Sequence, residues 1–93
     1  MIITRTDLDV LTTQAKVSTR LRATLDLRNS VADNSQRILN AIAPGTDIPI
    51  HRHKRSSETC VCVRGHFEEY FIDEAGELTD IIDMVPGGIV LNI

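Results

Sequence analysis

The segment GTDIPIHRHKRSSETCVCVRG, residues 45–65, decides which fold this sequence predicts. In it, His51 and His53 lie two positions apart, and Glu58 follows shortly after them. Gly45 and Gly65 are the first and last residues of the segment. Successive side chains of a β-strand point to opposite faces, so a strand over 47–53 puts both histidines on one face. Their imidazoles then converge on one point.

A turn over the sequence KRSS, residues 54–57, brings the glutamate alongside the histidines. Glu58 then returns on the neighbouring strand, roughly 5 Å away across the ladder. Two imidazoles and one carboxylate form a three-ligand face with open coordination positions, which suits Fe, Mn, Ni or Zn. We therefore predict a divalent transition metal held by His51, His53 and Glu58. Two other interpretations stay open: surface residues of an edge hairpin, or the polar lining of a barrel that has lost its metal.

One helix and several short strands are predicted along the chain. Leu8, Leu11 and Ala15 share a helical face, and Thr6 is placed to cap a helix over about 6–17. From about residue 22 the pattern alternates, and turn residues separate the strand-like segments RATLDL (22–27), QRILNAIA (36–43), DIPIHRH (47–53), ETCVCVR (58–64), HFEEYFID (66–73) and LTDIIDM (78–84). Short strands at even spacing are typical of an antiparallel sandwich or barrel. A length of 93 residues predicts a single domain over 1–93.

Composition excludes several classes of function. Ten basic and thirteen acidic side chains give a net charge of −3, which argues against a nucleic-acid partner because such binding needs clustered positive charge. The first residues lack the basic start and apolar run of a signal peptide, and no apolar run is long enough to span a membrane. We therefore expect a cytoplasmic protein with no membrane partner.

Cys60 and Cys62 are the only cysteines, and they share the strand face of Glu58. On a strand they point the same way, which does not suit a disulfide. They are predicted to line the interior near the metal, with Cys60 nearest. One interpretation is simple apolar packing, and the other is an outer-sphere neighbour that tunes the metal or oxidises near it.

The spacing Gly45-x5-His51-x-His53-x4-Glu58-x6-Gly65 resembles the first conserved motif of the cupin superfamily. The resemblance implies a mainly β fold, a jelly-roll-like antiparallel β-barrel, with a metal bound by the histidines and the glutamate. The run QRILNAIAPGTDIPIHRH, residues 36–53, is similar to the WbuC-type cupin fold metalloproteins, and so are the short preceding helix and the arginines after Ser18. This second resemblance covers the chain from about Leu8 to the end.

The WbuC resemblance implies a setting in bacterial O-antigen or other surface-polysaccharide metabolism, and a small sugar-related ligand. That family has no firmly assigned reaction, so whether the chain is an enzyme stays open, and no residue stands out as a general base. Arg20, Arg22 and Arg37 are candidate substrate-binding residues because forked guanidinium groups bind anionic sugars in pairs of hydrogen bonds. Solvated arginines that cover apolar surface are the alternative.

The sequence departs from the cupin pattern after Gly88. Cupins carry a second motif whose histidine supplies a fourth ligand, but here Gly88 is followed by IVLNI, residues 89–93, where the chain ends. We therefore expect a barrel that is incomplete at its C-terminus, weak metal binding, and an open edge that favours a homo-oligomer. A non-catalytic small-molecule-binding or oligomerising accessory protein with a vestigial metal site is the alternative function.

Overall fold

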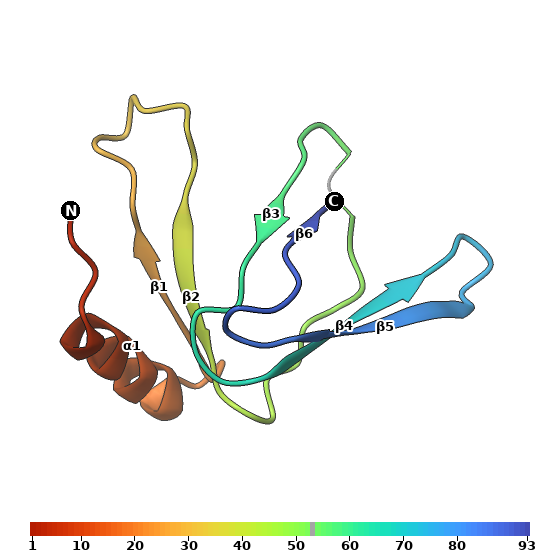
Figure 1. The fold of residues 1–93 in the computed structure, drawn as a ribbon, viewed down its shortest axis with the longest axis horizontal. Helices are drawn as coiled ribbons and strands as arrows, with labels where there is room; N and C mark the ends of the chain where they lie inside the picture. The colour runs from red at the N-terminus through yellow and green to blue at the C-terminus, as the bar shows by residue number, and fades with distance from the viewer. Residues whose placement is uncertain (53) are drawn as a thin grey trace. The chain divides into compact units, whose positions relative to one another are not determined.

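The structure, a computed structural model, describes residues 1–52 and 54–93 (Figure 1). The chain separates into two compact units, Met1–Ile50 and His51–Ile93. Over the described residues it contains one helix and six strands, which pair into three antiparallel two-stranded sheets. The prediction of a mainly β protein with antiparallel sheets and one short N-terminal helix is therefore confirmed. These described strands do not close into a barrel.

The first unit begins with helix α1 (Arg5–Val17), which is capped by Thr4. The Thr4 hydroxyl accepts a hydrogen bond from the backbone N–H of Asp7 at 3.3 Å, and the Asp7 carboxylate accepts one from the Thr4 backbone N–H at 2.7 Å. This is a capping box. The prediction that Thr6 caps the helix is wrong, because the T-x-x-D pattern occurs at 4–7 as well as at 6–9, and the earlier copy adds length to the helix.

Strands β1 (Arg22–Asp26) and β2 (Ile38–Ile42) form an antiparallel hairpin that contacts α1 (Figure 1). In the register of the pair, Arg22 faces Ile42 and Asp26 faces Ile38. On the helix, Leu11 is 6% exposed and Ala15 is 1% exposed. The hairpin residues of one face are half-buried, namely Ala23, Leu25, Leu39 and Ala41. Two strands alone are only marginally stable in water, so the packed helix is what stabilises this hairpin.

Leu21 joins the helix to β1 in a left-handed conformation, with φ of 55°. This conformation costs about 1–2 kcal/mol in a residue with a side chain, so its surroundings must impose it. The Leu21 carbonyl accepts hydrogen bonds from the Ala43 N–H and from the Thr46 hydroxyl, both at 2.9 Å. Gly45 has φ of +92°, and a Cβ added there would lie 3.4 Å from Leu21 Cδ1. The turn is therefore fixed by residues more than twenty positions away.

The second unit contains two strand pairs. Strand β3 (Thr59–Cys60) pairs with β6 (Leu91–Asn92), and the backbones of Glu58 and Ile93 exchange hydrogen bonds of 2.9 and 2.8 Å beside them. Strands β4 (Phe67–Ile72) and β5 (Leu78–Met84) form the other hairpin, with an irregularity between Phe71 and Ile72. Cys62, at 6% exposed, and Met84, at 2%, are its buried apolar residues among those described.

The strand predicted over 47–53 does not form across its described residues, 47–52. The expected ladder between this segment and Glu58 is also wrong for the described part, because β3 pairs with β6. Pro49 lacks a backbone N–H and cannot donate to a ladder, which weakens this segment as a central strand. The terminal residues Leu91 and Asn92, expected at an unpaired edge, pair with β3 on one side. The sheet has two strands, so no described strand pairs with the other side of β6.

No helix in the described ranges, 1–52 and 54–93, has the length and apolar character needed to cross a membrane.

The capping box makes Thr4 important for the first unit. Replacing Thr4 with Ala removes the acceptor for the Asp7 N–H, so the free energy of unfolding is expected to fall by about 0.5–2 kcal/mol. The control is Thr13→Ala, at an exposed helical position where the change should stay within about 0.5 kcal/mol. Urea unfolding followed by circular dichroism measures both. Equal stability of the two variants would contradict the role of Thr4.

Candidate functional site

The predicted metal ligands lie in the second unit, at its start. His51 and Glu58 are both exposed, and His53 lies outside the described residues. Among the residues that the structure describes, no three His, Cys, Asp or Glu side chains lie close enough together to hold a metal ion. Only two of the three predicted ligands, His51 and Glu58, are among the described residues. The predicted convergence of His51, His53 and Glu58 therefore stays a prediction.

Both glycines of the predicted metal motif have a backbone conformation that favours glycine. Gly45 has φ of +92° and Gly65 has φ of +83°, in the left-handed region that favours glycine. The two positions end the segment that carries the histidines and the glutamate. Their conformation explains why the motif has glycine at these positions.

The Cys60 thiol lies against the carboxylate of Glu58. Its Sγ donates a hydrogen bond to Glu58 Oε1 at 3.2 Å. Burial raises the pKa of Cys60 to about 12, with a further contribution from the hydrogen bond and charge of Glu58. The thiol therefore stays protonated near neutral pH. In this state it orients the carboxylate, and it is a poor nucleophile because the thiolate is the reactive form.

Cys62 lies on the less exposed side of the same segment. Exposure alternates along it, with Val61 at 60% and Val63 at 52% exposed on either side of a Cys62 that is 6% exposed. The Cys62 Sγ lies 3.5 Å from the carbonyl oxygen of Arg64 and 3.6 Å from that of Gly65. Both cysteines are free thiols. Cys62 therefore packs against the turn at Gly65 as a small buried residue.

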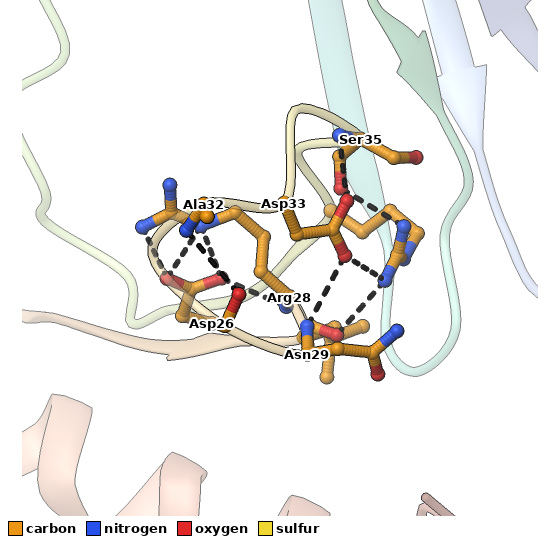
Figure 2. A network of polar contacts seen from close by, with 9 residues as sticks. Asp26, Arg28, Asn29, Ala32, Asp33 and Ser35 are labelled. Carbon is orange, nitrogen blue, oxygen red and sulfur yellow. Dashed lines mark hydrogen bonds and ion pairs between the residues drawn. The ribbon is translucent and has the colours of Figure 1, made fainter.

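Arg37, a predicted substrate-binding residue, is part of the loop between β1 and β2. Its guanidinium donates to the carbonyl oxygens of Ser35 at 2.9 Å and Leu27 at 3.1 Å, and to Asp33 Oδ2 at 3.3 Å. The Asp33 carboxylate also accepts from the backbone N–H groups of Ser35 at 2.9 Å and Asn29 at 3.2 Å (Figure 2). Arg37 is therefore used to close this loop.

Figure 2 also shows the ion pair of Asp26 and Arg28, whose closest atoms are 2.8 Å apart. Hydrogen bonds from the Arg28 side chain and backbone lower the pKa of Asp26. The loop thus contains two arginine–carboxylate pairs, one with Asp26 and one with Asp33.

Arg20 and Arg22 lie at the opposite end of the hairpin from Arg37, around two open hollows. One hollow, of about 230 Å³, is lined by Thr19, Arg20, Leu21, Arg22, Gly45 and Asp47. The other, of about 260 Å³, shares Arg20 and Arg22 and adds Ala23, Thr24 and Asn40. The structure thus brings two of the three predicted arginines together and separates the third. Sequence reasoning did not find Thr24 and Asn40, which face each other across the ladder, because the strand register was not known.

The chain belongs to a family described as a domain of unknown function, DUF6016, whose model matches residues 3–84. The matched region runs from the N-terminal cap of α1 to the end of β5. Neither the curated proteins nor the solved structures contain a match to this chain. Because the family's description assigns no activity, the function has to be argued from the residues themselves.

The hydrogen bonds of Asp33 in the β1–β2 loop, which we call the loop network, make the stability of the first unit depend on pH. Hydrogen bonds from the backbone N–H of Ser35, and to a smaller degree from that of Asn29, hold the pKa of Asp33 below its usual value. The ionised carboxylate therefore stabilises the folded chain at neutral pH. This stabilisation is lost as the pH falls below about 4, when the unfolded chain takes up the proton first. The slope of unfolding free energy against pH should therefore be smaller in Asp33→Asn than in the wild type between about pH 2 and 4. Val31→Ala, at an exposed position of the same loop without an ionisable group, should keep the wild-type slope.

The thiol–carboxylate contact predicts slow alkylation of Cys60. With a pKa of about 12, only about one Cys60 in 10⁴ is ionised at pH 8, so iodoacetamide should modify it far more slowly than a free thiol. Glu58→Gln removes a charge that raises this pKa, so the rate at which iodoacetamide alkylates Cys60 should increase several-fold. Glu77→Gln, an exposed control in the β4–β5 turn, should leave the rate unchanged. Peptide mapping of chelator-treated protein measures the rate at each cysteine, and a wild-type rate equal to that of free cysteine would refute the assignment.

Proposed function

We propose that this chain is a cupin-type protein that binds a divalent transition metal through His51, His53 and Glu58. The observation that carries the proposal is the match of residues 45–65 to the cupin metal motif, and the left-handed conformation of both motif glycines supports it. The proposal includes closure of the strands into a jelly-roll-like barrel.

The donor set fits such a metal. Two neutral imidazoles and a carboxylate are ligands that Fe, Mn, Ni and Zn accept. Cys60 is placed to act next to this set, because its thiol donates to the Glu58 carboxylate at 3.2 Å. Hydrogen bonds of this kind fix the orientation of a ligating carboxylate. A bound metal would supply Lewis-acid chemistry or a centre for O₂ binding.

The proposed ligand is a small sugar-related molecule, in bacterial surface-polysaccharide metabolism. The similarity of residues 36–53 to the WbuC-type proteins supports this part of the proposal. A protein in this setting could bind such a molecule or catalyse a reaction on it, and both functions occur on folds that are as widely used as the cupin barrel. The metal site is therefore the first property to test.

Metal titration tests the proposal directly. Calorimetry with Zn²⁺, Ni²⁺ and Mn²⁺ should show one site per chain with weak affinity, because three protein ligands leave the remaining positions to water. Loss of even an outer partner typically costs 10- to 100-fold in affinity, so His51→Gln and Glu58→Gln should each weaken binding by at least that factor. His66→Gln is the matched control, because His66 lies outside the motif and pairs with Asp83 at 2.9 Å.

The same titration at lower pH gives an independent check. Both imidazoles must be neutral to coordinate, so affinity should fall as the pH drops through about 6.5. The His66→Gln variant keeps both motif histidines, so it should lose affinity over the same pH range as the wild type, and a smaller loss would show that His66 contributes to the effect. Binding that is submicromolar and insensitive to pH would contradict a site built from these three ligands alone.

The alternative function is that of an oligomerising accessory protein with a vestigial metal site. It is favoured by the apolar side chains that are more than half exposed in the second unit, namely Val61, Val63, Ile89, Val90 and Ile93. Exposed apolar surface of this kind favours association with another chain. Light scattering tests this alternative, because it requires a stable homo-oligomer whether or not metal is present. A stable monomer would exclude it, and an oligomer that binds no metal in the titration would favour it over the metal-binding function.

A further inference from the structure

We propose that the first unit contains a binding site for the phosphate or carboxylate group of a small hydroxylated molecule. Its anion-binding residues are Arg20 and Arg22, which line both hollows beside the turn at Leu21. Thr24 and Asn40 supply the neighbouring neutral polar groups. The site lies within residues 19–47 and requires no metal. It rests on the proposed function for the sugar-related character of its ligand, and it extends that function by assigning the residues that bind the anionic group.

The two arginines differ from the arginines of the β1–β2 loop in having no protein partner. Arg28 is paired with Asp26, and Arg37 is paired with Asp33. In the described ranges, the guanidinium groups of Arg20 and Arg22 form no hydrogen bond and no ion pair. Their donors are therefore available to a ligand, and a planar guanidinium binds phosphate or carboxylate through two parallel hydrogen bonds.

The backbone between these arginines is held in a strained conformation. Leu21 is the residue with positive φ among the described non-glycine residues, and it lies directly between Arg20 and Arg22. Its carbonyl is held by Ala43 and Thr46, so the strain is imposed by tertiary contacts. Strained residues of this kind cluster at active sites and ligand clamps. The position of Leu21 between the two arginines therefore supports a ligand site at this turn.

The uncharged lining indicates what the anion is attached to. Thr24 and Asn40 are cross-strand partners and both are exposed, so their hydroxyl and amide groups can bind the hydroxyls of a ligand. Asp47 lines the other hollow and adds an acceptor for a hydroxyl. The negative charge of Asp47 also makes the binding of a highly charged anion less favourable. The lining thus favours a molecule with one anionic group and several hydroxyls.

The hollows are open and small, with volumes of about 230 and 260 Å³. Both volumes are below the range of roughly 300–1,000 Å³ for pockets that hold drug-sized ligands. A single sugar ring with one phosphate or carboxylate is of suitable size. We expect binding to be weak and to decrease with added salt, because both arginines are solvated in the free protein.

The test uses the full chain in the presence of a chelator, so that its outcome does not depend on the metal site. Glucose 1-phosphate, glucuronate and inorganic phosphate are titrated while amide chemical shifts are recorded. Shifts should occur at residues 19–24, 40 and 45–47. Tighter binding of glucose 1-phosphate than of inorganic phosphate supports a ligand with hydroxyls, and tighter binding of glucuronate identifies the anion as a carboxylate.

Variants assign the binding to the two arginines. Arg22→Gln and Arg20→Gln should each weaken binding at least 10-fold, whereas Arg5→Gln, an exposed arginine of α1, should leave it unchanged. Arg22→Lys keeps the charge but loses the paired hydrogen bonds, so it should give an intermediate affinity if the protein is folded. The proposal is overturned if none of the three probes shifts these amides, or if Arg5→Gln weakens binding as much as Arg22→Gln.

Discussion

The carbonyl of Leu21 is the group on which the first unit depends. It accepts one hydrogen bond from the backbone after β2 and one from the Thr46 side chain. These bonds connect the end of the helix, the start of β1 and the segment after β2 at one point. The close approach of Gly45 to Leu21 requires the same geometry. Without this contact, the left-handed conformation would relax and the hairpin would lose its fixed direction from the helix.

The apolar cores of both units are small, which makes such polar contacts more important. Among the described residues, the buried hydrophobic ones are Leu11, Ala15, Cys62 and Met84. Hydrophobic burial normally supplies most of the stabilising free energy. Here the capping box at Thr4, the loop network around Asp33 and the turn at Leu21 supplement it. All three lie in the first unit, so changes of pH or sequence at these contacts are expected to affect the stability of that unit.

Sequence periodicity predicted the regular elements well. The helix and the segments of β1, β2, β4 and β5 were predicted because their alternation or helical spacing extends over five or more residues. Strands β3 and β6 have two residues each, so periodicity carries little information about their length. The pairing of β3 with β6 joins residues 59–60 to residues 91–92, and no local pattern predicts such a distant partner.

The candidate sites were predictable to different degrees for the same reason. Arg20, Arg22 and Arg37 are equivalent as sequence, since each is an arginine near a predicted strand. Only the structure distinguishes Arg37, whose donors are used by Ser35, Leu27 and Asp33. Leu21 gave no signal at all, because a left-handed leucine is an exception to the preference for glycine or asparagine. Tertiary hydrogen bonds override local preference there.

The metal motif contains two kinds of information that the structure separates. Gly45 has a structural role in the first unit, because it lies next to Leu21 in a left-handed turn. That role exists whether or not a metal is bound. The glycines are therefore evidence about the fold, whereas His51, His53 and Glu58 are the residues on which the proposal of a metal site rests. Glu58 also accepts a hydrogen bond from the Cys60 thiol, so this carboxylate has a structural contact that needs no metal. The chemistry of the histidines is thus the part of the motif that a fold alone does not explain.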